Sequence, residues 1–302
     1  MLHTLNFDTI TDLFQFMGLG APAHPLIALL NYDAVQVDLH NAGIGVTLDF
    51  YKITFKKDFN GSMRYGPGSY IFKEGGMAFL APGQIVQMTA EPGDYQGYAL
   101  YFHPDLLANH DLAQRIHRYG FFDYSVAEAL FLSADEKLTM EGLFQSIDVE
   151  LHNHIDQFSD DVLVSQLDLL LNHSNRFYSR QFQTRQGIYH ELIVRMGERL
   201  AERLDEAVIK GLPSPQDLAI HLNVSQRYLS DMLTSLTGKT TQQHIHLALI
   251  NKAKVLLNHT SLTTAEIAYQ LGFEHPQSFN KLFKQRTNVS PAQYRRQQIG
   301  AH

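Results

Sequence analysis

A chain of 302 residues, 44% of them hydrophobic, is long enough to form two domains with separate cores. It contains no cysteine, which excludes disulfides and thiolate metal sites and is typical of a reducing cytosol. The first residues carry no basic stretch, and no apolar run reaches the roughly eighteen residues of a membrane span. We therefore expect a cytoplasmic protein that is neither secreted nor embedded in a membrane.

Residues 22–103 have the pattern of short β-strands. Runs rich in β-branched and aromatic residues are separated by Gly and Pro clusters, which predicts a small sandwich or barrel. Gly76 and Pro82 have the glycine-five-proline spacing of one half of the cupin barrel signature. Residues 1–20 predict a short helix or loop. The expected strands are 34–41, 45–55, 69–74, 77–83, 84–90 and 96–103.

Two amphipathic helices are expected next, at 135–154 and 160–178. The second carries four leucines at three- and four-residue spacing, a seam of about two heptads: Leu163, Leu167, Leu170 and Leu171. This pattern is typical either of a dimer contact or of helices that only cover the strands. The polar, basic segment 176–188 is predicted to be the interdomain linker, with Arg180 or Arg185 touching phosphate.

The segment 261–297 has the pattern of a helix-turn-helix. Thr263 and Glu266 have capping-box spacing, with Ser261 as the alternative start, and Gly272 suits the turn because glycine tolerates a positive φ. In the second helix three apolar residues turn toward the first: Phe279, Leu282 and Phe283. Its outward face is polar, as in a helix that reads the major groove, and consists of Gln277, Ser278, Asn280, Lys281 and Lys284.

The same pattern occurs about fifty residues earlier, at 213–240. Thr237-Gly238 corresponds to Thr287-Asn288, and Gly and Asn are the residues best suited to a left-handed helix end. The apolar positions of the second helix also correspond, as Leu229, Met232 and Leu233. One such pattern is weak evidence, but two in register, joined by a helix expected at 242–258, are hard to obtain by accident.

Charge supports a nucleic-acid role for this part of the chain. The net charge is −7. Residues 1–175 contain 8 Lys and Arg against 22 Asp and Glu, a net −14, whereas residues 176–302 contain 16 against 9, a net +7. A basic C-terminal part predicts that this half meets phosphate. The alternative is a dipolar protein whose charged faces are merely solvated.

Residues 189–297 resemble the DNA-binding domain of AraC/XylS-type transcriptional regulators. The resemblance covers about a third of the chain and implies a cupin-like sensor ahead of this domain, a homodimer formed through the sensor's helices, and activation through RNA polymerase. Asp231 departs from the residue that most members place there. The strings that carry the resemblance are 225-SQRYLSDML-233, 237-TGKT-240, 266-EIAYQLGF-273, 278-SFNKLFK-284 and 288-NVSPAQYR-295.

The predicted fold is therefore a two-domain α+β protein. Residues 1–175 would form a cupin-like sensor and dimerisation domain, with a β-barrel at about 22–103 and flanking helices at about 135–175. After the linker, residues 189–302 would form an all-α domain with two helix-turn-helix motifs, at about 214–238 and 263–287.

DNA-contacting residues are expected on the second helix of each motif. Arg227 has the chemistry to grip guanine; Asp231 either accepts from cytosine or orients Arg227 from one turn away, and we favour the orienting role. The expected base contacts are Gln226, Arg227, Ser230, Asp231, Gln277, Ser278 and Lys281. The expected phosphate contacts are Ser225, Thr240, Lys284 and Arg286.

The N-terminal domain is expected to be free of metal and cofactor. The His-x-His pair of metal-binding cupins is missing around Tyr51–Tyr70, and Val86-Gln87 stands where a further His is expected. A small effector is expected among the barrel aromatics Tyr51, Tyr70, Phe72 and Tyr101. Two alternatives stay open: a cupin enzyme with an accessory DNA-binding domain, and a regulator whose N-terminal domain only dimerises or binds a protein.

Overall fold

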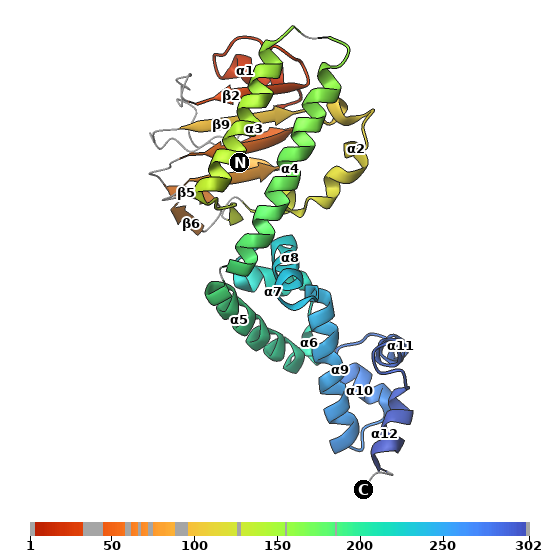
Figure 1. Ribbon diagram of the computed structural model, residues 1–302. Helices are drawn as coiled ribbons and strands as arrows, with labels where there is room; N and C mark the ends of the chain where they lie inside the picture. Colours follow the sequence, from red (N-terminus) through yellow and green to blue (C-terminus); the bar gives the residue numbers. More distant parts are fainter. Residues whose placement is uncertain are drawn as a thin grey trace. The chain divides into compact units, whose positions relative to one another are not determined.

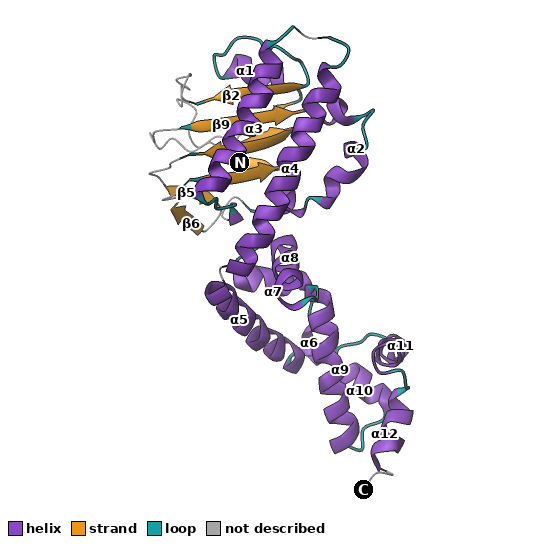
Figure 2. Ribbon diagram, viewed as in Figure 1, coloured by secondary structure: helices purple, strands orange, loops and turns teal. Residues whose placement is uncertain are grey.

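The protein divides into two compact units, Met1–Gln181 and Phe182–His302. The structure, a computed structural model, describes residues 4–32, 45–57, 62–65, 68–71, 75–87, 96–125, 128–154, 156–184 and 186–299 (Figure 1). Strands occur only in the first unit among these residues (Figure 2). None of the described helices is both long and apolar enough to cross a bilayer.

The first unit is built on β-sheets, as predicted. One sheet has the strand order β1-β3-β8, a second has β2-β9-β4-β7, and β5 pairs with β6. The strand expected at 34–41 lies outside the described residues, as does the end of the strand expected at 69–74. The strands are β1 (Thr4–Phe7), β2 (Ile27–Asn31), β3 (Gly45–Leu48), β4 (Tyr51–Lys56), β5 (Ser62–Tyr65), β6 (Gly68–Ile71), β7 (Gly76–Leu80), β8 (Ile85–Gln87) and β9 (Gly97–Phe102).

An apolar core lies between the two larger sheets. It joins β3 to β2 and β9 and is closed by the short helix α1 (Ile10–Phe16). Since side chains alternate along a strand, every second residue of β2, β9 and β4 faces this interior. The core residues are Phe7, Ile10, Leu13, Phe14, Ala28, Leu30, Val46, Leu48, Phe50, Ala99 and Tyr101.

The opposite face of the four-stranded sheet is covered by helices. Short turns at η1 (Pro104–Leu107), α2 (Leu112–Arg115), η2 (Ile116–Arg118) and η3 (Gly120–Asp123) lead to α3 (Ala134–His152) and α4 (Ser159–Thr184), which lie side by side across the sheet (Figure 1). Phe144 of α3 stacks on Phe55 and Tyr98 at centroid distances of 5.5 and 5.3 Å. Both helices therefore cover the strands.

The leucine seam belongs to this covering layer. Leu163 is 1% exposed, and Leu167, Leu170 and Leu171 are fully buried within their own unit. The prediction that these four side chains form a dimer contact is therefore wrong, because a buried side chain has no surface left to offer a partner. The 3.6-residue period marks which face is buried without saying what covers it.

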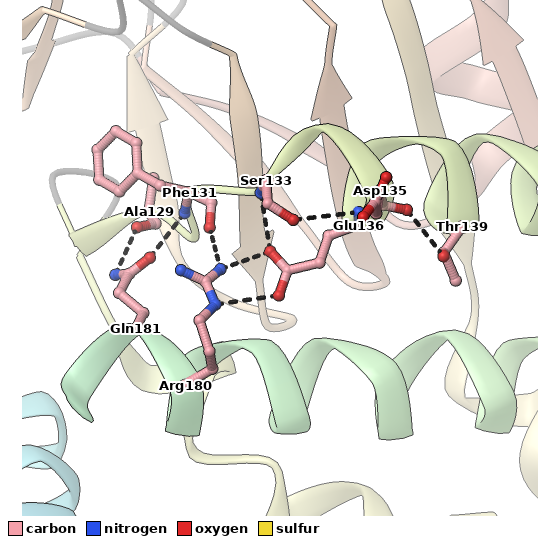
Figure 3. Close-up of polar contacts among 8 residues, drawn as sticks. All are labelled: Ala129, Phe131, Ser133, Asp135, Glu136, Thr139, Arg180 and Gln181. Carbon is pink, nitrogen blue, oxygen red and sulfur yellow. Dashed lines mark hydrogen bonds and ion pairs between the residues drawn. The ribbon is translucent and has the colours of Figure 1, made fainter. Parts of the chain in front are cut away.

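Polar contacts fix the end of α4 to the segment that precedes α3 (Figure 3). The Arg180 guanidinium binds both carboxylate oxygens of Glu136, at 3.0 and 2.6 Å, and donates to the Phe131 carbonyl at 2.7 Å. The Gln181 side chain accepts from the Phe131 N–H at 2.7 Å. The predicted linker 176–188 is thus mostly helical, and Arg180 is engaged in an ion pair. Arg185 lies outside the described residues.

The second unit is all-α, as predicted. Its helices are α5 (Gln186–Asp205), α6 (Ala207–Lys210), α7 (Pro215–Leu222), α8 (Gln226–Thr237), α9 (Thr241–His259), α10 (Thr264–Gln270), α11 (Pro276–Thr287) and α12 (Pro291–Ile299). The pairs α7–α8 and α10–α11 are the two expected helix-turn-helix motifs, and α9 joins them. One face of α9 is buried along its length at Ile245, Leu249, Ala253 and Leu257.

Candidate nucleic-acid interface

The two helix-turn-helix motifs share their local chemistry. Ser214 starts α7 with a capping box to Asp217, and Thr263 starts α10 with one to Glu266. The turns close alike, because the Val224 N–H donates to the Ala219 carbonyl at 3.1 Å and the Phe273 N–H donates to Ala268 at 3.0 Å. The sequence repeat is therefore a structural repeat, and Thr263, not Ser261, is the cap.

The turn residues differ in how tightly they are held. Asn223 takes a positive φ of 56° at the end of α7, and Gly272 takes 85° in the second motif. A Cβ at Gly272 would lie 2.8 Å from the Ala207 carbonyl oxygen. Only glycine fits there, so the second turn depends on its missing side chain.

Helix α8 buries its apolar side and exposes a polar one. Leu229, Met232 and Leu233 are fully buried, whereas Gln226 and Arg227 are exposed. Arg227 Nε lies 3.0 Å from Asp231 Oδ2, four residues further on. The structure thus holds the pair that the orienting role of Asp231 requires. Because both side chains are partly exposed to solvent, the pair adds little to stability and mainly fixes where the guanidinium points.

Helix α11 has the same division. Phe279 and Phe283 are buried at 1% and 0% exposure. The polar residues of its outer face are all exposed, namely Gln277, Ser278, Lys281, Lys284 and Arg286. Leu282 is only partly buried, so the inward stripe of α11 is narrower than predicted. Both second helices therefore present polar side chains on an apolar backing.

The predicted phosphate contacts Ser225 and Thr240 are helix caps. The Ser225 hydroxyl accepts from the Tyr228 N–H at 3.2 Å, and that of Thr240 accepts from the Gln243 N–H at 3.3 Å. Each therefore stands at a helix N-terminus, where backbone N–H groups and the helix dipole favour an anion. This placement suits phosphate as well as a cap.

Two histidines near the start of α9 were missed by the sequence reasoning. His246 Nδ1 lies 3.2 Å from an Arg286 terminal nitrogen, which links α9 to α11, and His244 Nε2 lies 2.8 Å from the Thr237 hydroxyl oxygen. Burial, and then the neighbouring cation, lowers the pKa of each histidine. Both are therefore mainly neutral near pH 7, and they contact the C-terminal ends of α8 and α11. The only feature of the sequence that could have indicated these contacts is the position of both histidines on the helix that joins the two motifs.

The expected effector residues do not converge. Tyr51 lies opposite Phe102 on the neighbouring strand, whereas Tyr101 lies opposite Lys52, so the two tyrosines point to opposite faces of the sheet. Tyr51 stacks on Phe102 at 4.8 Å on the helix-covered face, and Tyr101 is in the core. The prediction of one site between them is therefore wrong. The Tyr70 side chain and Phe72 lie outside the described residues.

In the described part of the chain, no group of three or more His, Asp or Glu side chains is arranged to hold a metal ion.

Comparisons with known proteins place both units in families. Residues 60–165 match the family of AraC-like ligand binding domains, and residues 218–297 match a helix-turn-helix domain family. The chain thus joins a match to an AraC-like ligand binding domain with a match to a helix-turn-helix domain. The N-terminal match is to an AraC-like domain, and the order of the two domains is the one that the resemblance to AraC-type regulators implies.

Curated relatives match over only part of their length. The chain is 35% identical over 104 residues to the HTH-type transcriptional activator RhaR of Cronobacter sakazakii, covering 33% of this chain and 36% of RhaR. It is 36% identical over 81 residues to the uncharacterized HTH-type transcriptional regulator YisR of Bacillus subtilis, covering 27% and 28%. The chain thus spans about a third of the length of these relatives. Among solved structures, the C-terminal domain of AraT, a response regulator from Geobacillus stearothermophilus, matches with 29% identity and a TM-score of 0.32, covering 35% of this chain and 84% of that one.

Proposed function

We propose that the protein is a sequence-specific transcriptional regulator, most simply an activator that acts with RNA polymerase. The observation that carries this proposal is the repeat of α7–α8 in α10–α11, each with an exposed polar face on its second helix. A relative that matches a third of the chain is named a transcriptional activator. This role requires access to DNA in the cytoplasm and no enzymatic step.

Each second helix would read bases in its own major-groove segment. On α8, Arg227 would bind guanine with Asp231 holding its guanidinium, beside Gln226 and Ser230. On α11, Gln277, Ser278 and Lys281 would read bases, while Lys284 and Arg286 bind phosphate. Ser225 and Thr240 would add phosphate contacts at helix starts.

Helix α9 sets the distance between the two readers. Its 19 residues span about 28 Å at about 1.5 Å per residue. Adding the offset of each motif brings the readers near the roughly 34 Å of one DNA turn. One protomer would therefore cover two successive major-groove segments of an asymmetric site.

Binding to a randomised DNA site, followed by footprinting, tests this arrangement. Arg227→Ala should relax base preference at one end of the site and Lys281→Ala at the other, each costing about 1–3 kcal/mol if the contact is bidentate. Lys284→Ala should weaken all sequences alike and reduce the salt dependence. Lys210→Ala, which removes an exposed cation from α6, is the control and should change neither the base preference nor the salt dependence of binding. Changes by Arg227→Ala and Lys281→Ala at the same base pairs, or at none, would contradict the two-groove reading.

The first unit would bind a small effector and form the homodimer. Since the leucine seam is buried, the dimer contact would use the outer face of α4. Val162 and Leu169 lie seven residues apart there and are 38% and 47% exposed. Apolar residues one heptad apart on a solvent-facing helix are what a helix–helix contact needs.

A further inference from the structure

The inner side of β4 is polar, unlike the rest of the interior that it faces. The register places Lys52 opposite Tyr101 and Thr54 opposite Ala99. Tyr101 and Ala99 belong to the apolar core between the sheets, so Lys52 and Thr54 share their side of the sheet. Lys56, two residues further on, shares it too. The alternating partners Ile53 and Phe55 are fully buried on the other face.

The strands beside this polar row carry progressively smaller side chains. Lys52 has Tyr101 and Leu80 as cross-strand neighbours. Thr54 lies between Ala99 and Ala78, and Lys56 lies between Gly97 and Gly76. Position 97 cannot carry a side chain, because a Cβ there would lie 2.1 Å from the Phe55 carbonyl oxygen. The cross-strand neighbours of Thr54 and Lys56 are therefore all alanine or glycine.

Solvent reaches this part of the inner face. Thr54 and Ala78 are partly exposed, although β4 is an internal strand of its sheet and the core residues Ala99 and Tyr101 are buried. We call Lys52, Thr54, Lys56 and Ala78 the inner basic patch.

The two lysines of the patch make it a site of concentrated positive charge. Lys56 is only 9% exposed, and burial, followed by repulsion from Lys52, lowers the pKa of Lys56 to about 8. The Lys52 ammonium lies 5.5 Å from the centre of the Tyr101 ring. Residues 1–175 carry a net −14, so this cationic row stands out against the charge of its own unit. A negative ligand near both ammonium groups would favour the charged form of Lys56.

We propose that the inner basic patch binds a small organic carboxylate, as the effector of the ligand-binding role proposed above. Its carboxylate lies between the Lys52 and Lys56 ammonium groups, within reach of the Thr54 hydroxyl. Its apolar part lies against Ala78 and the Tyr101 ring. Charge selects the ligand at the lysines, and the small side chains of β7 and β9 set its size.

Calorimetric titration of the full chain tests the proposal. The probes are benzoate and octanoate, with benzamide and octanamide as uncharged counterparts, all at constant ionic strength. We expect at least one carboxylate to bind, its amide to bind at least tenfold more weakly, and Lys52→Met and Lys56→Met each to raise the Kd at least tenfold. Lys52→Arg, which keeps the charge, should retain most of the affinity. Arg118→Met removes an exposed cation of the same unit and should leave the Kd unchanged.

Three results would overturn the proposal: no binding of either carboxylate to wild type, equal binding of the amides, or undiminished binding in both Met variants. Circular dichroism of the Met variants confirms that they are folded. Binding of the same variants to DNA without carboxylate separates this proposal from the regulatory one. If carboxylate binds but DNA does not, the regulatory role fails and the patch stands; if DNA binds but carboxylate does not, the patch fails alone.

Discussion

Lys56→Met should stabilise the unliganded protein near neutral pH. A pKa lowered from 10.5 to about 8 means that the folded protein holds this lysine's proton less tightly than the unfolded chain does. The difference corresponds to about 3 kcal/mol at pH 7, at about 1.4 kcal/mol for each tenfold change in proton affinity. Methionine fills a similar volume without charge and should recover a large part of that free energy.

The pH dependence gives the sharper test. Between pH 8 and 10.5 the unfolded chain still binds the Lys56 proton while the folded protein has released it, so the free energy of unfolding rises with pH in this window. Below pH 8 both states bind the proton and Lys56 contributes no slope. In Lys56→Met this rise is absent, and the stabilisation relative to wild type should fall toward zero by about pH 10.5.

Urea unfolding followed by circular dichroism at pH 7, 8, 9 and 10 measures both effects. Other lysines and tyrosines titrate in the same range, so the informative quantity is the difference between variant and wild type. Arg118→Met serves as the charge-matched control and should show a constant difference. A Lys56→Met protein that is less stable than wild type at pH 7, or that keeps the wild-type slope, would refute the reasoning.

Further substitutions test the proposed dimer contact and the packing of the fold. Leu169→Asp should leave the first unit folded, because Leu169 is 47% exposed, and should convert a dimer to monomers in sedimentation; an unaltered dimer would exclude this face of α4 from the contact. Leu167→Ala, at a fully buried position, should instead lower the free energy of unfolding by about 2–5 kcal/mol. Gly272→Ala should destabilise the second helix-turn-helix by more than about 1 kcal/mol, because it combines a positive φ with a Cβ 2.8 Å from the Ala207 carbonyl. Thermal unfolding measures that loss, and the exposed Gly142→Ala, with no atom within 4 Å of its Cβ, is the control.

The helix-turn-helix unit could be predicted almost residue by residue, because its signals are local. The capping box of Thr263 and Glu266 lies within four residues, and the left-handed ends at Gly238 and Asn288 are single-residue preferences. The spacing of Phe279 and Phe283 fixes the buried side of α11. Each of these features depends on chain geometry within one or two helical turns. Because of the internal repeat, the same pattern occurs twice in the sequence.

Contacts made across long sequence separations could not be predicted in the same way. Arg180 is read from the sequence as one cation in a polar stretch, but it pairs with Glu136, 44 residues away. Gln181 satisfies the backbone at Ala129 and Phe131, about 50 residues away (Figure 3). Because polar side chains suit a solvated linker and a satisfied tertiary contact equally well, composition cannot distinguish the two. The backbone groups of the segment before α3 determine which of the two applies, because Arg180 and Gln181 bind them.

Strand β4 shows the same limit at the proposed ligand site. Its sequence, Tyr51-Lys-Ile-Thr-Phe-Lys56, alternates apolar and polar residues, which ordinarily indicates an apolar face toward the interior of the sheets and a polar face toward solvent. Here helices α3 and α4 cover the apolar face, and the polar row faces the opposing sheet. Alternation separates two faces without saying which is covered, and only the helices, encoded some 80 residues later, settle it. The lysines that sequence analysis would assign to solvent therefore lie inside, where a charged ligand can be selected.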